Sequence, residues 1–461
     1  MSQDQVIFDA ELINRYNVSG PRYTSYPTAV QFSDQYQEED YRQWAKRSNQ
    51  EPEKPVSLYF HIPFCNRVCF YCGCNKIVTK NRGRAQPYLE RLHEEVRIQG
   101  QLFDADRWVD QLHWGGGTPT FISHDQMRAL MDQTRKSFRL RTDDSGEYSI
   151  EVDPREVKDG TISLLRELGF NRLSLGVQDF DARVQKAVNR IQPPEQTARV
   201  LENARSSDFR SINLDLIYGL PFQSVDSFSR TLDQVISCDP DRLSVFNYAH
   251  LPKMFKPQRR INESDLPSAS EKLAILQMTI EKLSKAGYIY IGMDHFAKPD
   301  DELAVAQRQG TLYRNFQGYS THADCDVIAM GVTAISKVGN SYSQNAKTEE
   351  PYYRAIDKGH LPVIRGITLT DDDLVRRAVI MRLICHFELN MRDIEQEYQI
   401  SFQQYFASEL EQLAKMQEDG LLEAGPELVK VAPVGKLLIR NICMVFDHYS
   451  KERENQFSKV I

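Results

Sequence analysis

The feature that most constrains the fold is a regular alternation of short apolar runs with helical patterns, which starts at residue 56. Between the runs, segments such as YLERLHEEVRIQG and EQTARVLENAR repeat apolar residues at three- and four-residue spacing, as amphipathic helices do. Strand–helix units in series predict a parallel sheet, and so many of them favour a closed or partly closed α/β barrel over an open doubly wound sheet. The six predicted strands, rich in Val, Ile, Leu and aromatic residues, are VSLYFH (56–61), WVDQLHW (108–114), EYSIEV (147–152), NRLSLG (171–176), SINLDLI (211–217) and DRLSVFN (241–247).

Polar and glycine-rich motifs follow the ends of these six runs. In chain order they are HIPFC, GGGTPT, EVDP, GVQDF, DLIYGLP and NYAHLP. In α/β barrels the chemistry lies on the loops after the C-terminal ends of the strands. The sequence therefore predicts one site, at one face, to which all six motifs contribute.

The pattern changes on either side of this region. After residue 370 the chain is mostly helical, with LLEAGPELVKV as a predicted hairpin, and we interpret 366–461 as a mainly helical C-terminal domain, winged-helix-like in character. Residues 1–55, which include GPRYTSYPTA, are predicted to form an ordered N-terminal strap. The remainder, 56–365, is assigned to the barrel and its extension.

Charge and hydropathy exclude several classes of function. The 461 residues carry a net charge of −7 with no block of basic residues, so nucleic-acid binding has no electrostatic support. The overall charge does not exclude a polyanionic small molecule, because a local group of arginines can bind one. No apolar run is long enough to span a membrane, and the first residues are too polar and acidic for a secretory signal or transit peptide. We therefore expect a cytoplasmic protein.

The sulfur of the chain is concentrated in one place. Four of the eight cysteines lie in CNRVCFYCGC (65–74), and the other four are isolated in the sequence, where we expect small buried side chains: Cys238, Cys325, Cys385 and Cys443. In a reducing compartment, clustered thiols bind a metal or do redox chemistry more often than they form structural disulfides.

The spacing of Cys65, Cys69 and Cys72 is C-x3-C-x2-C. A structural zinc site uses two C-x2-C pairs further apart, a redox dithiol needs only one such pair, and ferredoxin runs have other spacings. Three thiolates on a short loop can instead hold three irons of a four-iron cluster and leave the fourth iron open to a small molecule. We favour this open cluster, with zinc or disulfide chemistry as alternatives. Cys74 is either free for hydrogen-atom or electron chemistry or a spare ligand.

CNRVCFYC, with Tyr71 directly before Cys72, resembles the motif of the radical S-adenosylmethionine (radical SAM) superfamily. Within it the chain closely resembles the oxygen-independent coproporphyrinogen III oxidases, through strings that run nearly end to end: GPRYTSYPTA, SLYFHIPFC, CGCNKI, LHWGGGTPT, SIEVDPRE, GVQDF, DLIYGLP, SVFNYAHLP, GMDHFAKPDDELAVAQ, NFQGY and IRNICMVFD. The resemblance implies a partial (β/α)6 TIM-like barrel of radical SAM type, one 4Fe-4S cluster and two molecules of S-adenosyl-L-methionine.

The resemblance also implies the reaction. An oxidoreductase of this family (coproporphyrinogen dehydrogenase) decarboxylates the propionates on rings A and B of coproporphyrinogen III to vinyl groups, which gives protoporphyrinogen IX in haem biosynthesis. A 5′-deoxyadenosyl radical takes a hydrogen atom from the propionate β-carbon, and loss of CO₂ and one electron completes each vinyl group. The implied partners are coproporphyrinogen III, an electron donor for the cluster and a terminal electron acceptor, and we expect a monomer.

Site residues are assigned on the matching strings. Cys65, Cys69 and Cys72 would ligate the cluster, while Tyr59 and Cys74 would act in catalysis, Cys74 without binding iron. The two S-adenosylmethionine sites would take their contacts from Tyr59, Tyr71, Gly116, Gly117, Thr118, Glu151, Gln178, Arg190, Asp215, Ala249 and Ile335. The residue types suit such a ligand: glycine backbone allows close approach, carboxylates suit ribose hydroxyls or ammonium groups, and an arginine can pair with a carboxylate in bidentate fashion.

Two rival functions remain at this point. A haem-chaperone-like radical SAM paralogue would bind haem without decarboxylating anything, but Cys74 in CGCN and the strap motif PRYTSYP argue against it. A structural zinc or redox-sensor module would contain zinc without iron and sulfide.

Overall fold

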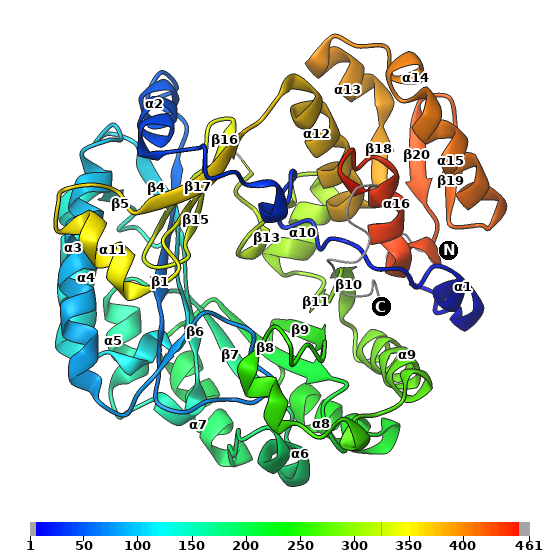
Figure 1. Cartoon of the computed structure of the whole chain (residues 1–461). Helices are drawn as coiled ribbons and strands as arrows, with labels where there is room; N and C mark the ends of the chain where they lie inside the picture. Colours follow the sequence, from blue (N-terminus) through cyan, green and yellow to red (C-terminus); the bar gives the residue numbers. More distant parts are fainter. Residues whose placement is uncertain (1–5, 324, 451–461) are drawn as a thin grey trace. The chain divides into compact units, whose positions relative to one another are not determined.

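The computed structural model describes residues 6–323 and 325–450, and the chain forms two compact units (Figure 1). The barrel unit comprises Phe32–Lys272 and Asp324–Thr368. The C-terminal unit comprises Met1–Gln31, Leu273–Ala323 and Leu369–Ile461. None of the described helices has the length and apolar character needed to cross a membrane.

The barrel unit is built on one curved sheet whose strands follow the spatial order β9-β8-β7-β6-β4-β1-β14-β15-β16-β17 (Figure 1). Its strands are β1 (Val56–Ile62), β4 (Trp108–Gly116), β6 (Glu147–Val152), β7 (Arg172–Gln178), β8 (Ser211–Tyr218), β9 (Arg242–Asn247), β14 (Asp326–Met330), β15 (Ile335–Val338), β16 (Ser341–Asn345) and β17 (Val363–Thr368). Three short strands accompany them: β2 (Phe64–Cys65), β3 (Ile77–Val78) and β5 (Arg139–Leu140).

All six predicted strands form, and neighbours pair in parallel in chain order from β1 to β9. The predicted partial α/β barrel is confirmed. The sheet also continues beyond β1, where β14 pairs in parallel and β15, β16 and β17 follow as antiparallel strands. These four strands were not predicted.

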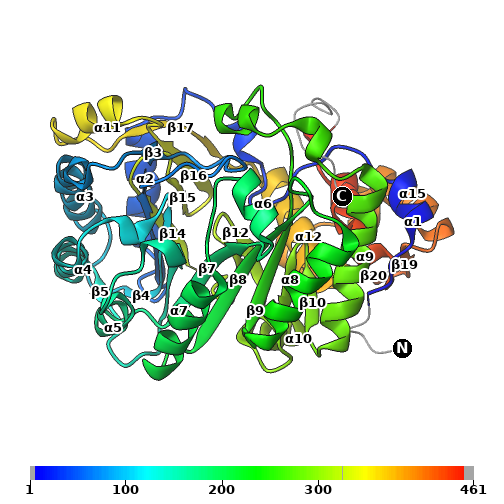
Figure 2. The same ribbon diagram turned by 90° about the horizontal axis from the view of Figure 1, so that it is seen from below.

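Helices on the outer face of the sheet connect the parallel strands, as Figures 1 and 2 show for α3, α4, α5 and α7. Several begin at side-chain caps: Ser123 at α4 and Ser224 at α8 each form a capping box, which satisfies backbone N–H groups that lack helical partners. The helices of this unit are α2 (Glu38–Ser48), α3 (Ala85–Gly100), α4 (His124–Ser137), α5 (Thr161–Glu167), α6 (Ala182–Ala187), α7 (Pro194–Ser206), α8 (Val225–Ser237) and α11 (Glu349–Ile356), and α9 (Ala269–Lys285) begins at its boundary.

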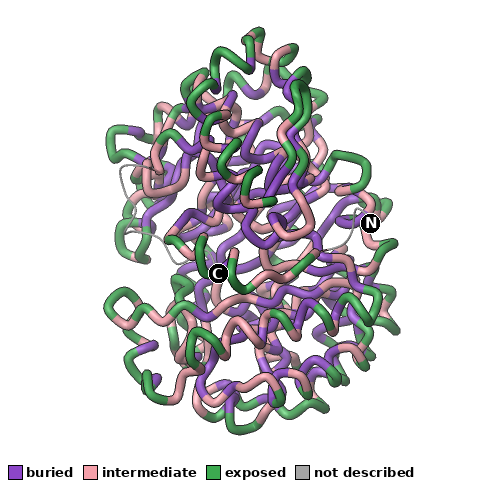
Figure 3. Tube along the Cα trace, turned by 90° about the vertical axis from the view of Figure 1, so that its right-hand side faces the viewer, coloured by how far each residue is buried: buried purple, intermediate pink, exposed green. Residues whose placement is uncertain are grey.

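Buried apolar residues alternate with partly buried polar residues along the strands, which separates the apolar core from the polar inner face. In β8, Ile212, Leu214 and Leu216 are buried, while Asn213 and Asp215 between them are only partly buried. Strand β7 repeats this pattern. Figure 3 shows buried segments mostly inside the trace and exposed segments mostly along its outside. Because side chains of a strand point alternately to its two faces, the helices cover the apolar face and the polar side chains share the other.

The C-terminal unit is mainly helical, as predicted. Its helices are α1 (Ala10–Arg15), most of α9, α10 (Glu302–Gln309), α12 (Asp371–His386), α13 (Met391–Tyr398), α14 (Phe402–Tyr405), α15 (Ala407–Glu418) and α16 (Ile439–Val445). Its strands are β10 (Ile289–Gly292), β11 (His295–Ala297), β12 (Tyr313–Asn315), β13 (Gly318–Ser320), β18 (Glu388–Asn390), β19 (Leu422–Ala424) and β20 (Leu428–Val431). The predicted hairpin is present as β19 and β20, and β18 adds a third strand that was not predicted.

Part of the predicted strap belongs to this unit. The carbonyl of Tyr16 accepts from Asn441 Nδ2 at 2.8 Å, and the hydroxyl of Tyr23 donates to Asp447 Oδ2 at 2.9 Å. Arg440 Nε donates to the carbonyl of Pro21 at 2.8 Å. The N-terminal segment is thus ordered by side chains of α16 and the turn after it.

Candidate active site

The four clustered cysteines lie on a loop between β1 and α3 that is closed at its base. Strands β2 and β3 pair in parallel there, and the amide of Ile77 donates to Pro63 O at 2.7 Å. The amide of Thr79 donates to Cys65 O at 2.9 Å. The base of the loop, which includes Cys65, is therefore tied to the end of β1, and the other three cysteines lie beyond this base.

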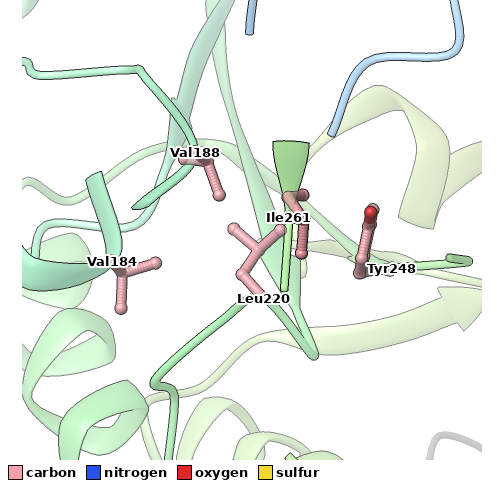
Figure 4. Close-up of a cluster of buried hydrophobic side chains, with 5 residues drawn as sticks. All are labelled: Val184, Val188, Leu220, Tyr248 and Ile261. Atoms are coloured by element: carbon pink, nitrogen blue, oxygen red, sulfur yellow. The ribbon is translucent and has the colours of Figure 1, made fainter. Parts of the chain in front are cut away.

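Two aromatic residues anchor the middle of this loop. Phe70 and Tyr71 pack against a buried apolar cluster (Figure 4), which consists of Val184, Val188, Leu220, Tyr248 and Ile261. The amide of Phe70 donates to Val188 O at 2.9 Å, and Gln258 Nε2 donates to Tyr71 O at 2.9 Å. Side chains from α6 and from the loops after β8 and β9 thereby position the cysteines.

The cysteines open onto a cavity of about 230 Å³. Twelve of the residues assigned above line it: Cys65, Cys69, Tyr71, Cys72, Cys74, Gly116, Gly117, Thr118, Glu151, Gln178, Arg190 and Asp215. Three do not line it: Tyr59, Ala249 and Ile335. The motifs after β1, β4, β6, β7 and β8 thus meet in one cavity, and the individual roles of these residues stay predictions.

Tyr59, Ala249 and Ile335 are not lining residues, but two of them lie beside residues that are. The Tyr59 ring stacks on that of His113, which hydrogen-bonds to Glu151, and Gln258 Nε2 donates to the carbonyls of both Tyr71 and Ala249. The hydroxyl of Tyr59 is 3.2 Å from His61 Nδ1, and Nε2 of that imidazole is 3.1 Å from the carbonyl of Asn75. Since a carbonyl only accepts, His61 donates through Nε2 and receives the tyrosine hydroxyl at Nδ1. Burial lowers the pKa of His61, which favours this neutral tautomer. Ala249 follows β9, and Ile335 begins β15.

The sulfur atoms differ in their surroundings. All eight cysteines are free of disulfide bonds. Burial raises the pKa of Cys65 to about 12, whereas a hydrogen bond from the Cys74 thiol lowers the pKa of Cys72 to about 6. Lys76 Nζ donates to the carbonyls of Cys72 and Cys74 at 3.0 and 3.3 Å. Cys72 is therefore the thiolate of this pair and Cys74 the thiol.

Two glycines at the end of β4 leave room at the cavity wall. A Cβ on Gly117 would lie 2.6 Å from Pro63 O, and Gly116 has a φ of +114° and would place a Cβ 2.8 Å from the His61 ring. The amide of Gly117 donates to Ile62 O at 2.9 Å. Only glycine allows the loops after β1 and β4 to come so close.

Two carboxylates face the cavity, and their pKa values are shifted in opposite directions. Burial alone would raise the pKa of Glu151, but hydrogen bonds from His113 and from the Gly116 amide hold it below its usual value. Burial raises the pKa of Asp215 to about 6, despite hydrogen bonds from Ser174 and Asn213. Glu151 is therefore ionised at neutral pH, whereas the pKa of Asp215 lies about one unit below neutral pH.

Gln178 occupies a strained backbone position at the end of β7. Its φ is +69°, in the left-handed region that non-glycine residues seldom adopt, and the register between β7 and β8 shifts at this point. A bulge of this kind re-aims a side chain, and strain is commonly retained at functional sites. The bulge places the Gln178 amide in the cavity wall.

Two buried arginines share one carboxylate beside the cysteines. Asp153 accepts from Arg155 Nη2 at 2.7 Å and from Arg190 Nη1 at 3.1 Å. Burial would raise the pKa of Asp153, but the two guanidinium groups lower it to about 2. Arg155 Nη1 and Arg190 Nε have no hydrogen-bond partner among the described residues.

These features fit the cluster and a small molecule that carries a carboxylate. Three thiols project from one loop, glycine backbone leaves the wall open, and buried guanidinium nitrogens lack protein partners. Within 6–323 and 325–450, no three His, Cys, Asp or Glu side chains converge as ligands of a single metal ion. Thiolate is the usual ligand of iron–sulfur clusters, so Cys65, Cys69 and Cys72 would hold one here.

Sequence reasoning missed part of the cavity wall. Lys76, Asp153, Arg155, Ser174 and Gly176 also line it. Asp153 and Arg155 stand in the quoted string SIEVDPRE, directly after a predicted strand. Their position at a C-terminal strand end was the available signal.

Comparisons with known proteins agree with this geometry. The family model described as the radical SAM superfamily matches residues 59–235, and that of the HemN C-terminal domain matches residues 369–438. An oxygen-independent coproporphyrinogen III oxidase of Pseudomonas aeruginosa is 56% identical over 99% of this chain and 100% of its own length. The chain belongs to the family of oxygen-independent coproporphyrinogen III oxidases.

Further members of this oxidase family are similar to the chain over nearly its full length. The Escherichia coli oxidase is 52% identical over the whole of both chains. A solved structure, titled coproporphyrinogen III oxidase (HemN) from Escherichia coli, a radical SAM enzyme, has a TM-score of 0.92 at 50% identity and covers 96% of this chain and 100% of its own. Membership implies a 4Fe-4S cluster and S-adenosylmethionine, and the haem-chaperone alternative is not favoured.

Proposed function

We propose that this chain catalyses the oxygen-independent oxidative decarboxylation of the ring A and ring B propionates of coproporphyrinogen III, which yields protoporphyrinogen IX in haem biosynthesis. The observation that carries the proposal is the cavity at the strand ends, where three thiols, a glycine wall and carboxylates converge, in a chain 56% identical end to end to a named oxidase. When bound, the cluster and S-adenosylmethionine supply a 5′-deoxyadenosyl radical that takes a hydrogen atom from the propionate β-carbon.

The residues of the cavity have separable tasks. Cys65, Cys69 and Cys72 hold the cluster on a loop whose base and middle are anchored. Glu151, ionised at neutral pH, suits an ammonium or ribose hydroxyl, and Arg190 suits a carboxylate. Several such contacts fix the orientation of the cofactor relative to one C–H bond of the substrate. They also help to keep water from the reactive species.

Two molecules of S-adenosylmethionine are proposed for the barrel unit. Tyr59, Ala249 and Ile335, which the family resemblance assigns to the cofactor, do not line the cysteine cavity. The family resemblance supports this number, and the contacts it assigns include residues of the cavity and residues just outside it. Equilibrium dialysis of the anaerobically reconstituted protein should reach two cofactors per chain, and a plateau at one would remove the second site.

The remaining partners follow from the reaction. An external electron donor must reduce the cluster, and a terminal acceptor must take the electron left after each decarboxylation. We propose that the protein is a cytoplasmic monomer. Sedimentation of the reconstituted protein tests its oligomeric state.

Product analysis tests the reaction. The reconstituted protein is supplied anaerobically with coproporphyrinogen III, S-adenosylmethionine, a reductant and cell extract as electron acceptor. Protoporphyrin after oxidation, 5′-deoxyadenosine and methionine should all form. Cys65→Ser should abolish all three, whereas Cys238→Ser, which alters an isolated cysteine outside the cavity, should leave them unchanged.

The possible failures are distinguishable. Cofactor cleavage without vinyl products would keep the cluster chemistry but reject coproporphyrinogen III as substrate. Iron and sulfide without either product would favour a haem-chaperone-like role, and zinc in place of iron would reject radical chemistry altogether.

A further inference from the structure

Two guanidinium groups converge on the sulfur of Cys69. Arg155 Nη2 lies 3.4 Å from Cys69 Sγ, and Arg190 Nη1 lies 3.5 Å from the same atom. The side chains of both arginines are less than a tenth exposed, at 8% and 7%. Of the three predicted cluster ligands, Cys69 is therefore the one that receives two buried cationic donors.

The turn after β6 holds Arg155 in place. This turn is a short 3₁₀ segment (Pro154–Glu156), and Asp153 caps it by accepting from the Arg155 amide at 3.0 Å. The same carboxylate accepts from Arg155 Nε at 3.0 Å, so backbone and side chain are fixed together. The guanidinium has little freedom to leave the sulfur.

The same turn contacts the cysteine loop at a second point. Glu156 accepts from Asn66 Nδ2 at 3.0 Å, one residue after the first cysteine of the loop, and Arg82 Nη2 donates to the other oxygen of this carboxylate at 2.6 Å. Residues 153–156 therefore bind the loop both near its start and at Cys69.

The local charge is not balanced by the protein. Asp153 supplies one negative charge between two cations, and Arg155 Nη1 and Arg190 Nε have no hydrogen-bond partner in the described part of the chain. Arg190 is already assigned to the carboxylate of S-adenosylmethionine. Arg155 has no such assignment, and one of its nitrogens points at the sulfur.

Hydrogen bonds and positive charge at a ligating sulfur stabilise the more negative, reduced form of an iron–sulfur cluster. We propose that Arg155 is a positioning residue that acts on the cluster through Cys69, raising its reduction potential and fixing the ligand loop. The inference rests on the proposed function, since it requires the cluster. One electron enters from an external one-electron reductant, and Arg155 neither gains nor loses a proton in the step.

The test measures the cluster itself, without substrate. EPR-monitored redox titration of the reconstituted protein gives the midpoint potential for the native chain, Arg155→Met and Arg155→Lys. Loss of both donor and charge in Arg155→Met should make reduction about tenfold less favourable, which for a one-electron couple is a midpoint about 59 mV more negative. Arg155→Lys keeps the charge but loses the planar fork, so its midpoint should fall between the two.

Arg166→Met is the matched control. Arg166 forms a bidentate ion pair with Asp144, which precedes β6, whereas Arg155 follows that strand. The control removes the same charge at the opposite end of the strand, and its midpoint should equal that of the native chain. Iron and sulfide content should be the same in all samples compared.

An unchanged midpoint in Arg155→Met with a full cluster would overturn the proposal. An equal shift in Arg166→Met would also overturn it, because net charge alone would then account for the effect. If Arg155→Met fails to assemble a cluster, Arg155→Lys decides: a midpoint below the native value supports the proposal, and a native midpoint overturns it. Failure of the native chain to form vinyl products would reject the substrate but leave the midpoint comparison intact.

Discussion

At the scale of single residues, Cys74 differs from the three cysteines that precede it. Its thiol donates to Cys72 and so lowers the pKa of that neighbour to about 6, which leaves Cys74 protonated. We predict that Cys74→Ala keeps the iron and sulfide of the cluster but lowers vinyl formation at least tenfold, about 1.4 kcal/mol in barrier. Metal analysis beside the product assay measures both, with Cys72→Ser as the control that loses iron. Equal loss of iron in the two variants would make Cys74 a ligand.

Asp215 should make cofactor binding depend on pH. Burial raises its pKa to about 6, and the carboxylate accepts strong hydrogen bonds from hydroxyl groups only when it is ionised. The affinity for S-adenosylmethionine should therefore be constant above about pH 7 and fall as the pH drops below about 6, approaching tenfold per unit. Binding to Asp215→Asn, measured by anaerobic calorimetry, should be weaker and flat across this range. The same pH dependence in that variant would assign the titration to another group.

At the scale of elements, α3 is joined to the end of β14 by one buried carboxylate. Glu95 accepts from the Gly331 amide at 2.8 Å, from Asn345 Nδ2 at 2.7 Å and from the Tyr352 hydroxyl at 2.6 Å. Tyr88, on the same helix, donates to His61 O at 2.6 Å. Helix α3 is therefore hydrogen-bonded to the ends of β1 and β14. The cysteine loop follows β1, and β15 follows β14.

The buried carboxylate gives a pH signature in stability. Burial raises the pKa of Glu95 from 4.5 to about 7. Between these values the folded chain binds more protons than the unfolded chain, so the free energy of unfolding should fall as pH rises from about 4.5 to 7, by on the order of 3 kcal/mol. Urea unfolding followed by tryptophan fluorescence suits this test, because all three tryptophans (Trp44, Trp108 and Trp114) lie in the barrel unit. Glu95→Gln should lack this slope, and an unchanged slope would place the titrating group elsewhere.

The elements also show how far the sequence predicts the fold. The six parallel strands were predictable because each is a compact apolar run before a polar motif. Strands β15 and β16 were missed although Gly339 and Asn340 between them form a typical hairpin signal. The strand-end position of Asp153 and Arg155 predicts that they lie near the site. Their contact with Cys69 could not be predicted, since only folding brings residues 153–155 next to residue 69.

At the scale of the whole molecule, the C-terminal unit is assembled from three separate segments of the chain. The hydroxyl of Tyr23, 1% exposed, donates to Asp447 Oδ2, and burial raises the pKa of that carboxyl. Sequence patterns cannot indicate such pairing, because the two residues are 424 positions apart. The predicted boundaries of strap, barrel and C-terminal domain stay predictions.

Removing that hydroxyl should loosen the C-terminal unit. Tyr23→Phe leaves a buried carboxyl oxygen without its donor, which costs about 1–3 kcal/mol. Hydrogen exchange within α16 should therefore accelerate at least about fivefold, while amides of β1 in the barrel unit serve as the internal reference. The double variant Tyr23→Phe with Asp447→Asn should be less destabilised than the sum of the two single changes. If α16 amides of Tyr23→Phe exchanged at the same rate as those of the native chain, the role given to the strap would be contradicted.

The central claim is that a radical formed in the barrel unit takes a hydrogen atom from the propionate β-carbon, and isotope transfer tests it most directly. Coproporphyrinogen III deuterated at that carbon is turned over anaerobically, and 5′-deoxyadenosine is analysed by mass spectrometry. The account predicts one deuterium in each 5′-deoxyadenosine, one such molecule for each vinyl group, and neither product from Cys65→Ser. Vinyl groups formed alongside unlabelled 5′-deoxyadenosine would contradict it.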